Sequence, residues 1–134
     1  MRVFFDTNVL VSAFTTRGLC AELFETALRE AEVVVGEPVI EELTRVLANK
    51  FRAAPDLVAR IAAELREREV VPAPVAVSSP VAADPADARI VACAIEAHAD
   101  LFITGDQALL ELGEIEGLPI LSPRQAWGRV AAND

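Results

Sequence analysis

The sequence predicts an α/β domain built on a mostly parallel central sheet, and three short segments carry this prediction. Residues 3–5, 33–35 and 101–104 are mostly apolar runs of branched and aromatic residues, and a helix-like segment follows each of them. Strands of a parallel sheet are buried on both faces and therefore read as continuous apolar runs. With 134 residues, of which 53% are hydrophobic and 25% charged, we expect one domain over residues 1–134 with a sizeable core.

The first predicted strand ends at Asp6, and a short helix over residues 8–14 follows it. Ligands of open α/β sheets gather outside the carboxyl ends of the strands, so this position favours a functional carboxylate. Capping of the following helix explains Asp6 equally well. Residues 19–31 carry apolar side chains at helical spacing, and the second strand after them ends at Gly36.

The next helix begins near Pro38, a favoured first-turn residue, and presents two adjacent glutamates to different surroundings. At about 100° per residue, Glu41 falls opposite the apolar face, whereas Glu42 falls on its flank. We expect Glu41 in solvent and Glu42 beside the core, where it either reaches a site or remains a surface residue. The face assigned to the core consists of Val39, Ile40, Leu43, Val46, Leu47 and Lys50.

A further helix is predicted over residues 56–69, with Leu57, Val58, Ile61, Ala62 and Leu65 directed inward. Half of the twelve basic residues lie in or near this helix and the one before it: Arg45, Lys50, Arg52, Arg60, Arg66 and Arg68. Acidic residues are interleaved with them, so they form either a solvated mixed-charge surface or a phosphate-binding patch. Residues 70–83 hold three prolines and no charge, which predicts an extended connector or an edge strand.

Asp84, Pro85 and Asp87 match the signals of a helix start, and the helix is expected to run to about Ala99. Capping accounts for Asp84. It accounts less well for Asp87, which heads the apolar stripe of the helix and therefore points along its buried face. The only histidine, His98, falls in the last turn, where the helix dipole favours a cation, so we place it outside any site.

The strand at residues 101–104 repeats the arrangement of the first, because it too delivers a carboxylate, Asp106, to the same edge of the sheet. A helix-like segment over residues 107–112 follows. A last short strand at 119–121 precedes a terminal helix that begins with Ser122 and Pro123. The side chains that this helix is expected to bury are Ala126, Trp127 and Val130.

Four carboxylates are thus expected at or near one edge of the sheet: Asp6, Glu42, Asp87 and Asp106. Carboxylates packed together repel one another and raise each other's pKa unless a cation neutralises them. Oxygen ligands without histidine or cysteine suit Mg²⁺ or Mn²⁺, and such ions activate water for attack at a phosphodiester. The net charge of −9 opposes nucleic-acid binding, but bound metal ions supply the positive charge that a polyanion requires.

Four stretches with these residues in place, FFDTNVLVSAF, PVIEELTRVL, DPADARIVACAIEAHADLFITGDQALL and ILSP, span nearly the whole chain. In this order they resemble the PIN-domain family, in particular the VapC-like toxins of bacterial and archaeal toxin–antitoxin pairs. The resemblance implies a three-layer α/β/α fold and a metal-dependent endoribonuclease acting on single-stranded RNA. It also implies a cognate antitoxin that covers the acidic site, and a homodimer.

By the same resemblance, Asp6, Glu42 and Asp87 are the core ligands of Mg²⁺ or Mn²⁺, and Asp106 binds a second ion or acts through water. Asn8 and Thr104 match polar positions that orient these ligands, and Asp84 is an outer candidate. Two departures from the family pattern are visible. Gly36 replaces a frequent serine cap, which leaves that helix start less well held, and Gln107-Ala108 replaces a charged pair that would contact substrate.

Three alternatives remain open. A phosphatase of the haloacid-dehalogenase type also places an aspartate after its first strand, but it requires a second aspartate where this chain has Asn8. A non-catalytic binding module would fit the acidic charge, and a housekeeping RNA-processing nuclease would share the proposed chemistry. Cys20 and Cys93 are far apart without a CxxC motif, and the chain shows neither a signal-peptide pattern nor a membrane span, so we expect a cytoplasmic protein.

Overall fold

The strands form one six-stranded sheet in the computed structural model, which describes residues 1–74 and 84–131. In sheet order they are β3 (Glu69–Val71), β2 (Glu32–Gly36), β1 (Arg2–Phe5), β4 (Leu101–Ile103), β6 (Leu118–Leu121) and β5 (Glu114–Ile115). All neighbouring pairs are parallel except β5 and β6, which form an antiparallel hairpin. The predicted, mostly parallel sheet is confirmed.

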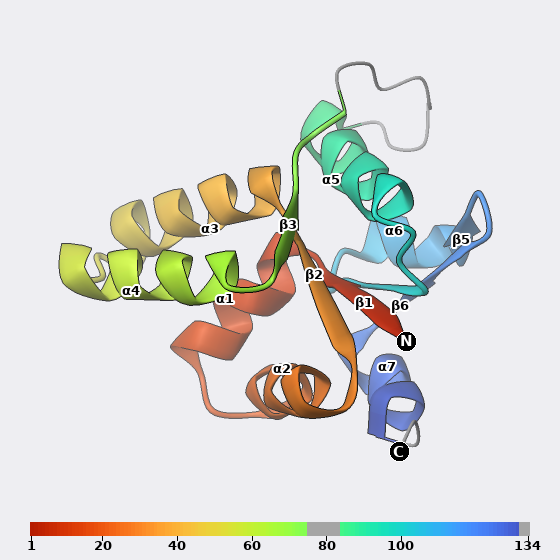
Figure 1. Cartoon of the computed structure of the whole chain (residues 1–134), viewed down its shortest axis with the longest axis horizontal. Helices are drawn as coiled ribbons and strands as arrows, with labels where there is room; N and C mark the ends of the chain where they lie inside the picture. The colour runs from red at the N-terminus through yellow and green to blue at the C-terminus, as the bar shows by residue number, and fades with distance from the viewer. Residues whose placement is uncertain (75–83, 132–134) are drawn as a thin grey trace.

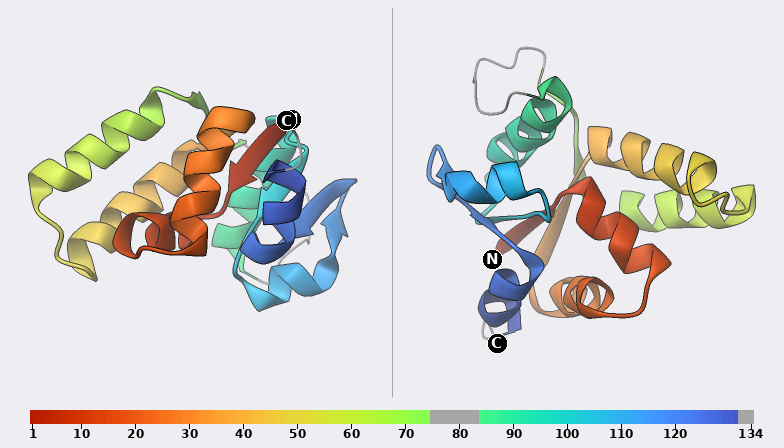
Figure 2. Two further views of the ribbon diagram at one scale, coloured as in Figure 1. Left: turned by 90° about the horizontal axis from the view of Figure 1, so that it is seen from below. Right: turned by 180° about the vertical axis from the view of Figure 1, so that it is seen from behind.

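Helices cover both faces of the sheet and complete the three-layer α/β/α arrangement (Figure 1). They are α1 (Thr7–Thr15), α2 (Leu19–Glu30), α3 (Glu37–Asn49), α4 (Pro55–Arg66), α5 (Pro85–Glu96), α6 (Gln107–Leu112) and α7 (Pro123–Ala131). Helices α5 and α6 lie on one side of the sheet, and α2 and α7 pack together on the other. Figure 2 shows α3 and α4 side by side, projecting from the molecule on the side away from α6 and β5.

The central strand β1 is buried because its side chains face helices on both sides of the sheet. Val3 and Phe4 are fully buried, and the ring of Phe4 stacks on that of Phe102 in the neighbouring strand at 5.7 Å between centroids. Burying aromatic and branched side chains in this way is the main favourable contribution to such a fold. The apolar runs that predicted the strands are therefore the centre of the core.

At the amino end of the sheet, Arg2 joins three strands and a helix. Its guanidinium donates to the carbonyl oxygen of Ala97 at 2.8 and 3.0 Å and pairs with Glu32 of β2 and with Glu69 of β3. The neighbouring carboxylates raise the pKa of Arg2, mainly through the hydrogen bond that Arg2 donates to Glu69, and the same bond lowers the pKa of Glu69. This cluster holds the sheet at the end opposite to the acidic residues.

Several predictions are corrected by the structure. The helix predicted to reach Glu69 ends at Arg66, because Val70 and Val71 pair with β2 and make β3 an edge strand. Leu57 is exposed rather than inward, since α4 packs against α3 and β3 through the stripe that includes Ile61 and Leu65. The extended segment predicted over residues 70–83 is β3 at its start, and its residues 75–83 lie outside the described part of the chain.

Two further features differ from the predictions. Lys50 follows α3 as its C-cap and is exposed instead of belonging to the core face. The hairpin of β5 and β6 was not predicted, because its turn is formed by Glu116 and Gly117, both with positive φ, a weak variant of the usual Asn-Gly signal. In the terminal helix, Ala126 and Val130 are buried as predicted and Trp127 is half-buried.

Cys20 and Cys93 are free thiols. None of the helices in the described ranges 1–74 and 84–131 has the length and apolar character needed to cross a membrane.

Candidate active site

Asp6 lies at the carboxyl end of β1 and is almost completely buried, with 4% of its surface exposed. Its Oδ1 accepts a hydrogen bond from the backbone N–H of Thr7 at 2.8 Å, so it caps α1. Its Oδ2 accepts from the hydroxyl of Thr104 at 2.7 Å and from the side-chain amide of Asn8 at 3.3 Å. Asp6 therefore caps α1 with one oxygen and is held by Thr104 and Asn8 through the other, so its role as a helix cap does not exclude a role in a site.

The parallel pairing of β1 with β4 brings Thr104 beside Asp6, since Phe5 lies opposite Ile103 in the register. Thr104 is fully buried, and its hydroxyl also accepts a hydrogen bond from the backbone N–H of Asp106 at 3.0 Å. The side-chain oxygen of Asn8 accepts from the backbone N–H of Gly105 at 2.9 Å. These bonds connect the ends of the two strands and fix the orientation of the Asp6 carboxylate.

A hollow of about 250 Å³ brings three of the four predicted acids together. Asp6 enters it from the end of β1, Glu42 from α3 and Asp87 from α5. As predicted from helical spacing, Glu42 is half-buried whereas the adjacent Glu41 is exposed. We call this space the acidic hollow; its other lining residues are Thr7, Asn8, Val11, Val46 and Lys50.

Asp106 and Asp84 lie outside the lining of the acidic hollow and act as helix caps. Asp106 Oδ1 accepts hydrogen bonds from the backbone N–H groups of Ala108 at 2.9 Å and Leu109 at 3.4 Å. Asp84 Oδ1 accepts from the N–H of Ala86 at 2.8 Å. Both are close enough for their charges to raise the pKa of Asp87, so they contribute to the field of the site.

Two carboxylates of the acidic hollow, those of Asp6 and Asp87, have a raised pKa because their charged forms are destabilised. Burial, and then the charges of Asp6, Asp84, Asp106 and Glu42, raise the pKa of Asp87 to about 6. Burial also raises the pKa of Asp6, against the opposing effect of its hydrogen bonds from Thr104 and Thr7. A cation placed among these groups would stabilise their charged forms.

The donor set of the acidic hollow consists of hard oxygen ligands, which suit Mg²⁺ or Mn²⁺. The hydroxyl of Thr7, which is buried and lacks a hydrogen-bond partner, lies on a residue of the same lining. Within the described ranges, no three carboxylate, imidazole or thiol groups are positioned to hold one ion together. The chemistry and charge of the residues that line the acidic hollow fit a divalent ion.

Lys50 was expected on the core face of its helix, but it is exposed and lines the acidic hollow. It projects into the acidic hollow together with Glu42 and Val46, which precede it by eight and four residues. Residues spaced by four lie on one side of a helix, so the spacing that placed Glu42 on the flank of α3 also indicated this position for Lys50.

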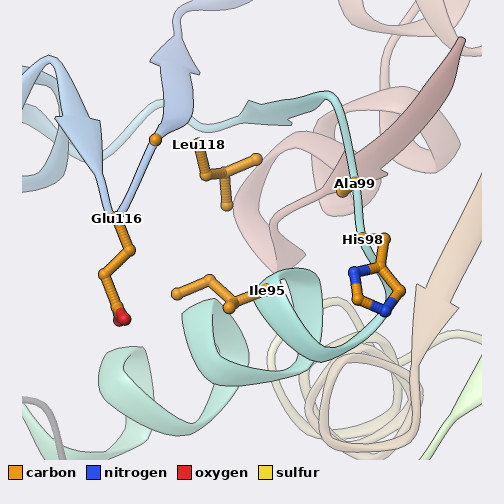
Figure 3. A pocket seen from close by; sticks show the side chains of 6 residues that line it. Ile95, His98, Ala99, Glu116 and Leu118 are labelled. Atoms are coloured by element: carbon orange, nitrogen blue, oxygen red, sulfur yellow. The ribbon is translucent and has the colours of Figure 1, made fainter.

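A second hollow, of about 330 Å³, lies at the amino ends of β4 and β6 (Figure 3). Its lining includes Ile95 and Leu118, with His98 and Glu116 on opposite sides. Although it is larger than the acidic hollow, it holds one carboxylate and lies at the wrong edge of the sheet for a site of this fold. His98 follows α5, which ends at Glu96 instead of near Ala99, so this histidine does not lie in the last helical turn as predicted.

Fold and site together define an α/β/α domain with an acidic hollow at the carboxyl edge of a mostly parallel sheet. A sequence model of the PIN domain matches residues 2–108. The chain therefore belongs to the PIN-domain family, as its motifs predicted. Membership of this family supports a nuclease function.

Solved structures with the same fold include three from bacterial VapBC systems. VapBC2 from Rickettsia felis, bound to a DNA fragment from its promoter, is 14% identical over 91% of this chain and 98% of that chain, with a TM-score of 0.66. VapBC-1 from nontypeable Haemophilus influenzae is 18% identical over 92% and 99%, with a TM-score of 0.65. Mycobacterium tuberculosis VapC20, a toxin that cleaves the sarcin–ricin loop, is 14% identical over 87% and 99%, with a TM-score of 0.62.

At these identities the likeness establishes the fold alone. A comparison with curated protein sequences found no match.

Proposed function

We propose that this protein is a Mg²⁺- or Mn²⁺-dependent endoribonuclease that cleaves single-stranded RNA in the acidic hollow. The observation that carries the proposal is the meeting of Asp6, Glu42 and Asp87 in one hollow at the carboxyl edge of the sheet. Membership of the PIN-domain family and the raised pKa of Asp87 support it.

A bound divalent ion supplies charge neutralisation and activation of water for attack at a phosphodiester. Asp6, Glu42 and Asp87 are the proposed ligands, and Asp106 is proposed to bind a second ion or to act through water. Thr104 and Asn8 donate hydrogen bonds to Oδ2 of Asp6 and hold its carboxylate in place in the lining of the acidic hollow. Positioning of this kind matters because misplacement of a reacting group by about 1 Å is costly to the rate.

Cleavage of labelled single-stranded RNA in Mg²⁺ or Mn²⁺, with and without EDTA, tests the proposal. Glu42→Gln and Asp87→Asn should abolish the metal-dependent cleavage. Glu25→Gln is the matched control, since it removes the same charge at an exposed position of α2 outside the acidic hollow and should cleave as the wild type does. Full cleavage by the Glu42 and Asp87 variants would show that the site is assigned wrongly.

We further propose that the protein is the toxin of a toxin–antitoxin pair and a homodimer. The structures of VapBC2 and VapBC-1 support this role, since the likeness covers nearly the whole of those chains. Expression of the wild type should arrest growth, and expression of Asp6→Asn should not. Relief of the arrest by the product of a small adjacent gene, and co-purification of the two proteins, would support the toxin role over a housekeeping nuclease.

A folded wild-type protein that neither binds Mn²⁺ nor cleaves a range of RNAs would instead be a non-catalytic binding module. The net charge of −9 is the feature of this chain that favours such a module.

A further inference from the structure

A second, smaller polar hollow adjoins the acidic hollow in the groove between α3 and α5. It measures about 90 Å³, and its charged lining residues are Glu41, Glu42 and Arg45 of α3 and Arg89 of α5. Glu42 lines both hollows, so they are continuous around its side chain. We call the smaller space the arginine notch.

Arg45 and Arg89 form no ion pair among the described residues, a property that they share with Arg52 and Arg60 but not with Arg66 and Arg68. Arg66 donates two hydrogen bonds to Glu37, at 2.7 and 2.8 Å, and Arg68 lies 3.7 Å from Glu67. Within the described ranges, the guanidinium groups of Arg45 and Arg89 have neither an ion-pair partner nor a hydrogen bond. Their positive charge is therefore available to a ligand.

The donor groups of the arginine notch indicate the kind of ligand. The notch is a small polar hollow of about 90 Å³ that opens to solvent and offers two guanidinium groups to an anionic group. Guanidinium groups bind phosphate oxygens with a planar pair of donors, and here they come from two separate helices. In a chain with a net charge of −9, Arg45 and Arg89 place two cationic donors beside the acidic hollow, in a lining that they share with Glu41 and Glu42.

We propose that Arg45 and Arg89 form a phosphate-binding subsite for the RNA strand, taking up a phosphate next to the one cleaved. This subsite rests on the proposed nuclease function. If RNA is cleaved in the acidic hollow, the strand would continue from there past Glu42 into the arginine notch. Neither arginine takes part in the chemistry. They position the strand and add to the electrostatic attraction that Lys50 supplies in the acidic hollow.

The salt dependence of RNA binding tests this subsite. Fluorescence anisotropy of a labelled single-stranded RNA, with Ca²⁺ in place of Mg²⁺ to slow cleavage, gives the association constant at several salt concentrations. Each phosphate contact on a single strand contributes about −0.7 to the slope of log K against log salt. The double variant Arg45→Gln/Arg89→Gln should therefore lose about 1.4 from the slope and bind about 25-fold more weakly at 0.1 M salt.

The matched control is Arg29→Gln/Arg60→Gln, which makes the same change in net charge at exposed positions of α2 and α4 outside both hollows. Its slope should equal that of the wild type. The subsite would be wrong if Arg45→Gln/Arg89→Gln kept the wild-type slope, or if the control lost as much of the slope as that variant. It would also be wrong if the wild type did not bind RNA. Melting temperatures show that each variant is folded.

The same samples separate this subsite from the nuclease function. If the wild type cleaves RNA but Arg45→Gln/Arg89→Gln keeps the wild-type salt dependence of binding, the nuclease function stands and the subsite is wrong. If the wild type binds RNA with a salt dependence that Arg45→Gln/Arg89→Gln reduces, but does not cleave the RNA, the subsite stands and the nuclease function is wrong.

Discussion

The hydroxyl of Thr104 donates a hydrogen bond of 2.7 Å to Oδ2 of Asp6, although 98 residues separate the two in the sequence. The same hydroxyl accepts a bond of 3.0 Å from the backbone N–H of Asp106. One buried oxygen atom therefore connects the end of β1, the end of β4 and two of the four predicted acids. This arrangement exists only because β1 and β4 are neighbours in the sheet.

Replacing Thr104 with valine should destabilise the protein and impair cleavage together. The substitution keeps the shape of the side chain but removes the donor to Asp6 and the acceptor for Asp106, leaving buried polar groups without partners. Such a loss costs about 1–3 kcal/mol. Urea denaturation measures the stability and the RNA assay measures the activity. Thr104→Ser, which keeps the hydroxyl, should recover most of both; equal defects in the serine and valine variants would contradict the role of the hydrogen bonds.

Asp87→Asn should stabilise the metal-free protein at neutral pH. The folded-state pKa of Asp87 is about 6, raised from 3.8 by burial and neighbouring charges, so the folded protein binds more protons than the unfolded chain between these values. Stability therefore falls as the pH rises from about 4 to about 6, and the penalty is fully present above that range. The asparagine variant does not carry this penalty.

The measurement is thermal unfolding in EDTA from pH 4 to pH 8. The advantage of Asp87→Asn should be largest above pH 6 and should vanish near pH 4. Glu25→Gln, at an exposed position of α2, is the control and should change little. A difference between wild type and Asp87→Asn that does not vary with pH would contradict the assigned cause.

Divalent ions should stabilise the folded protein through the acidic hollow. A ligand present at 100 times its dissociation constant adds about 2.7 kcal/mol to the free energy of unfolding. Mn²⁺ should therefore raise the melting temperature of the wild type and of Glu41→Gln by several degrees, and that of Glu42→Gln by less. The effect should weaken below about pH 6, since protons compete with the ion for Asp87. Equal shifts in the two glutamine variants would place the ion elsewhere.

Gly36→Ser should destabilise the protein, although serine at this place would supply a cap for α3. A Cβ atom on Gly36 would lie 2.9 Å from Cζ of Phe4 and 3.3 Å from Cβ of Cys93, both inside the core. Overpacking of this kind costs about 1–3 kcal/mol, more than a cap contributes in the typical case. The departure from the family pattern thus has a packing reason.

Gly128 provides the comparison for this prediction, because it lies in α7 and a Cβ atom there would meet nothing within 4 Å. Gly128→Ala should stabilise the protein by about 0.5–1 kcal/mol through helix propensity. Denaturant midpoints of the two variants should therefore move in opposite directions. A stabilising Gly36→Ser would show that the core around Phe4 yields more easily than its contacts indicate.

Local patterns in the sequence were sufficient for much of the fold and for the choice of acids. Continuous apolar runs identified β1, β2 and β4, because a strand that is buried on both faces does not alternate apolar with polar side chains. Helical spacing separated Glu42 from Glu41, since the direction of a side chain around a helix depends only on its position in the helix. The metal-ligand roles of Asp6, Glu42, Asp87 and Asp106 remain predictions that the proposed experiments test.

The tertiary structure decided what depends on contacts between distant segments. The helix before β3 ended early because pairing with β2 favoured a strand at Glu69, and Leu57 stayed exposed because α4 packs on few neighbours. The pairing of Thr104 with Asp6 required the neighbouring positions of β1 and β4, and the meeting of Arg45 with Arg89 required the packing of α3 on α5. Periodicity determines which side of an element is apolar, but only packing in three dimensions determines which elements that side meets.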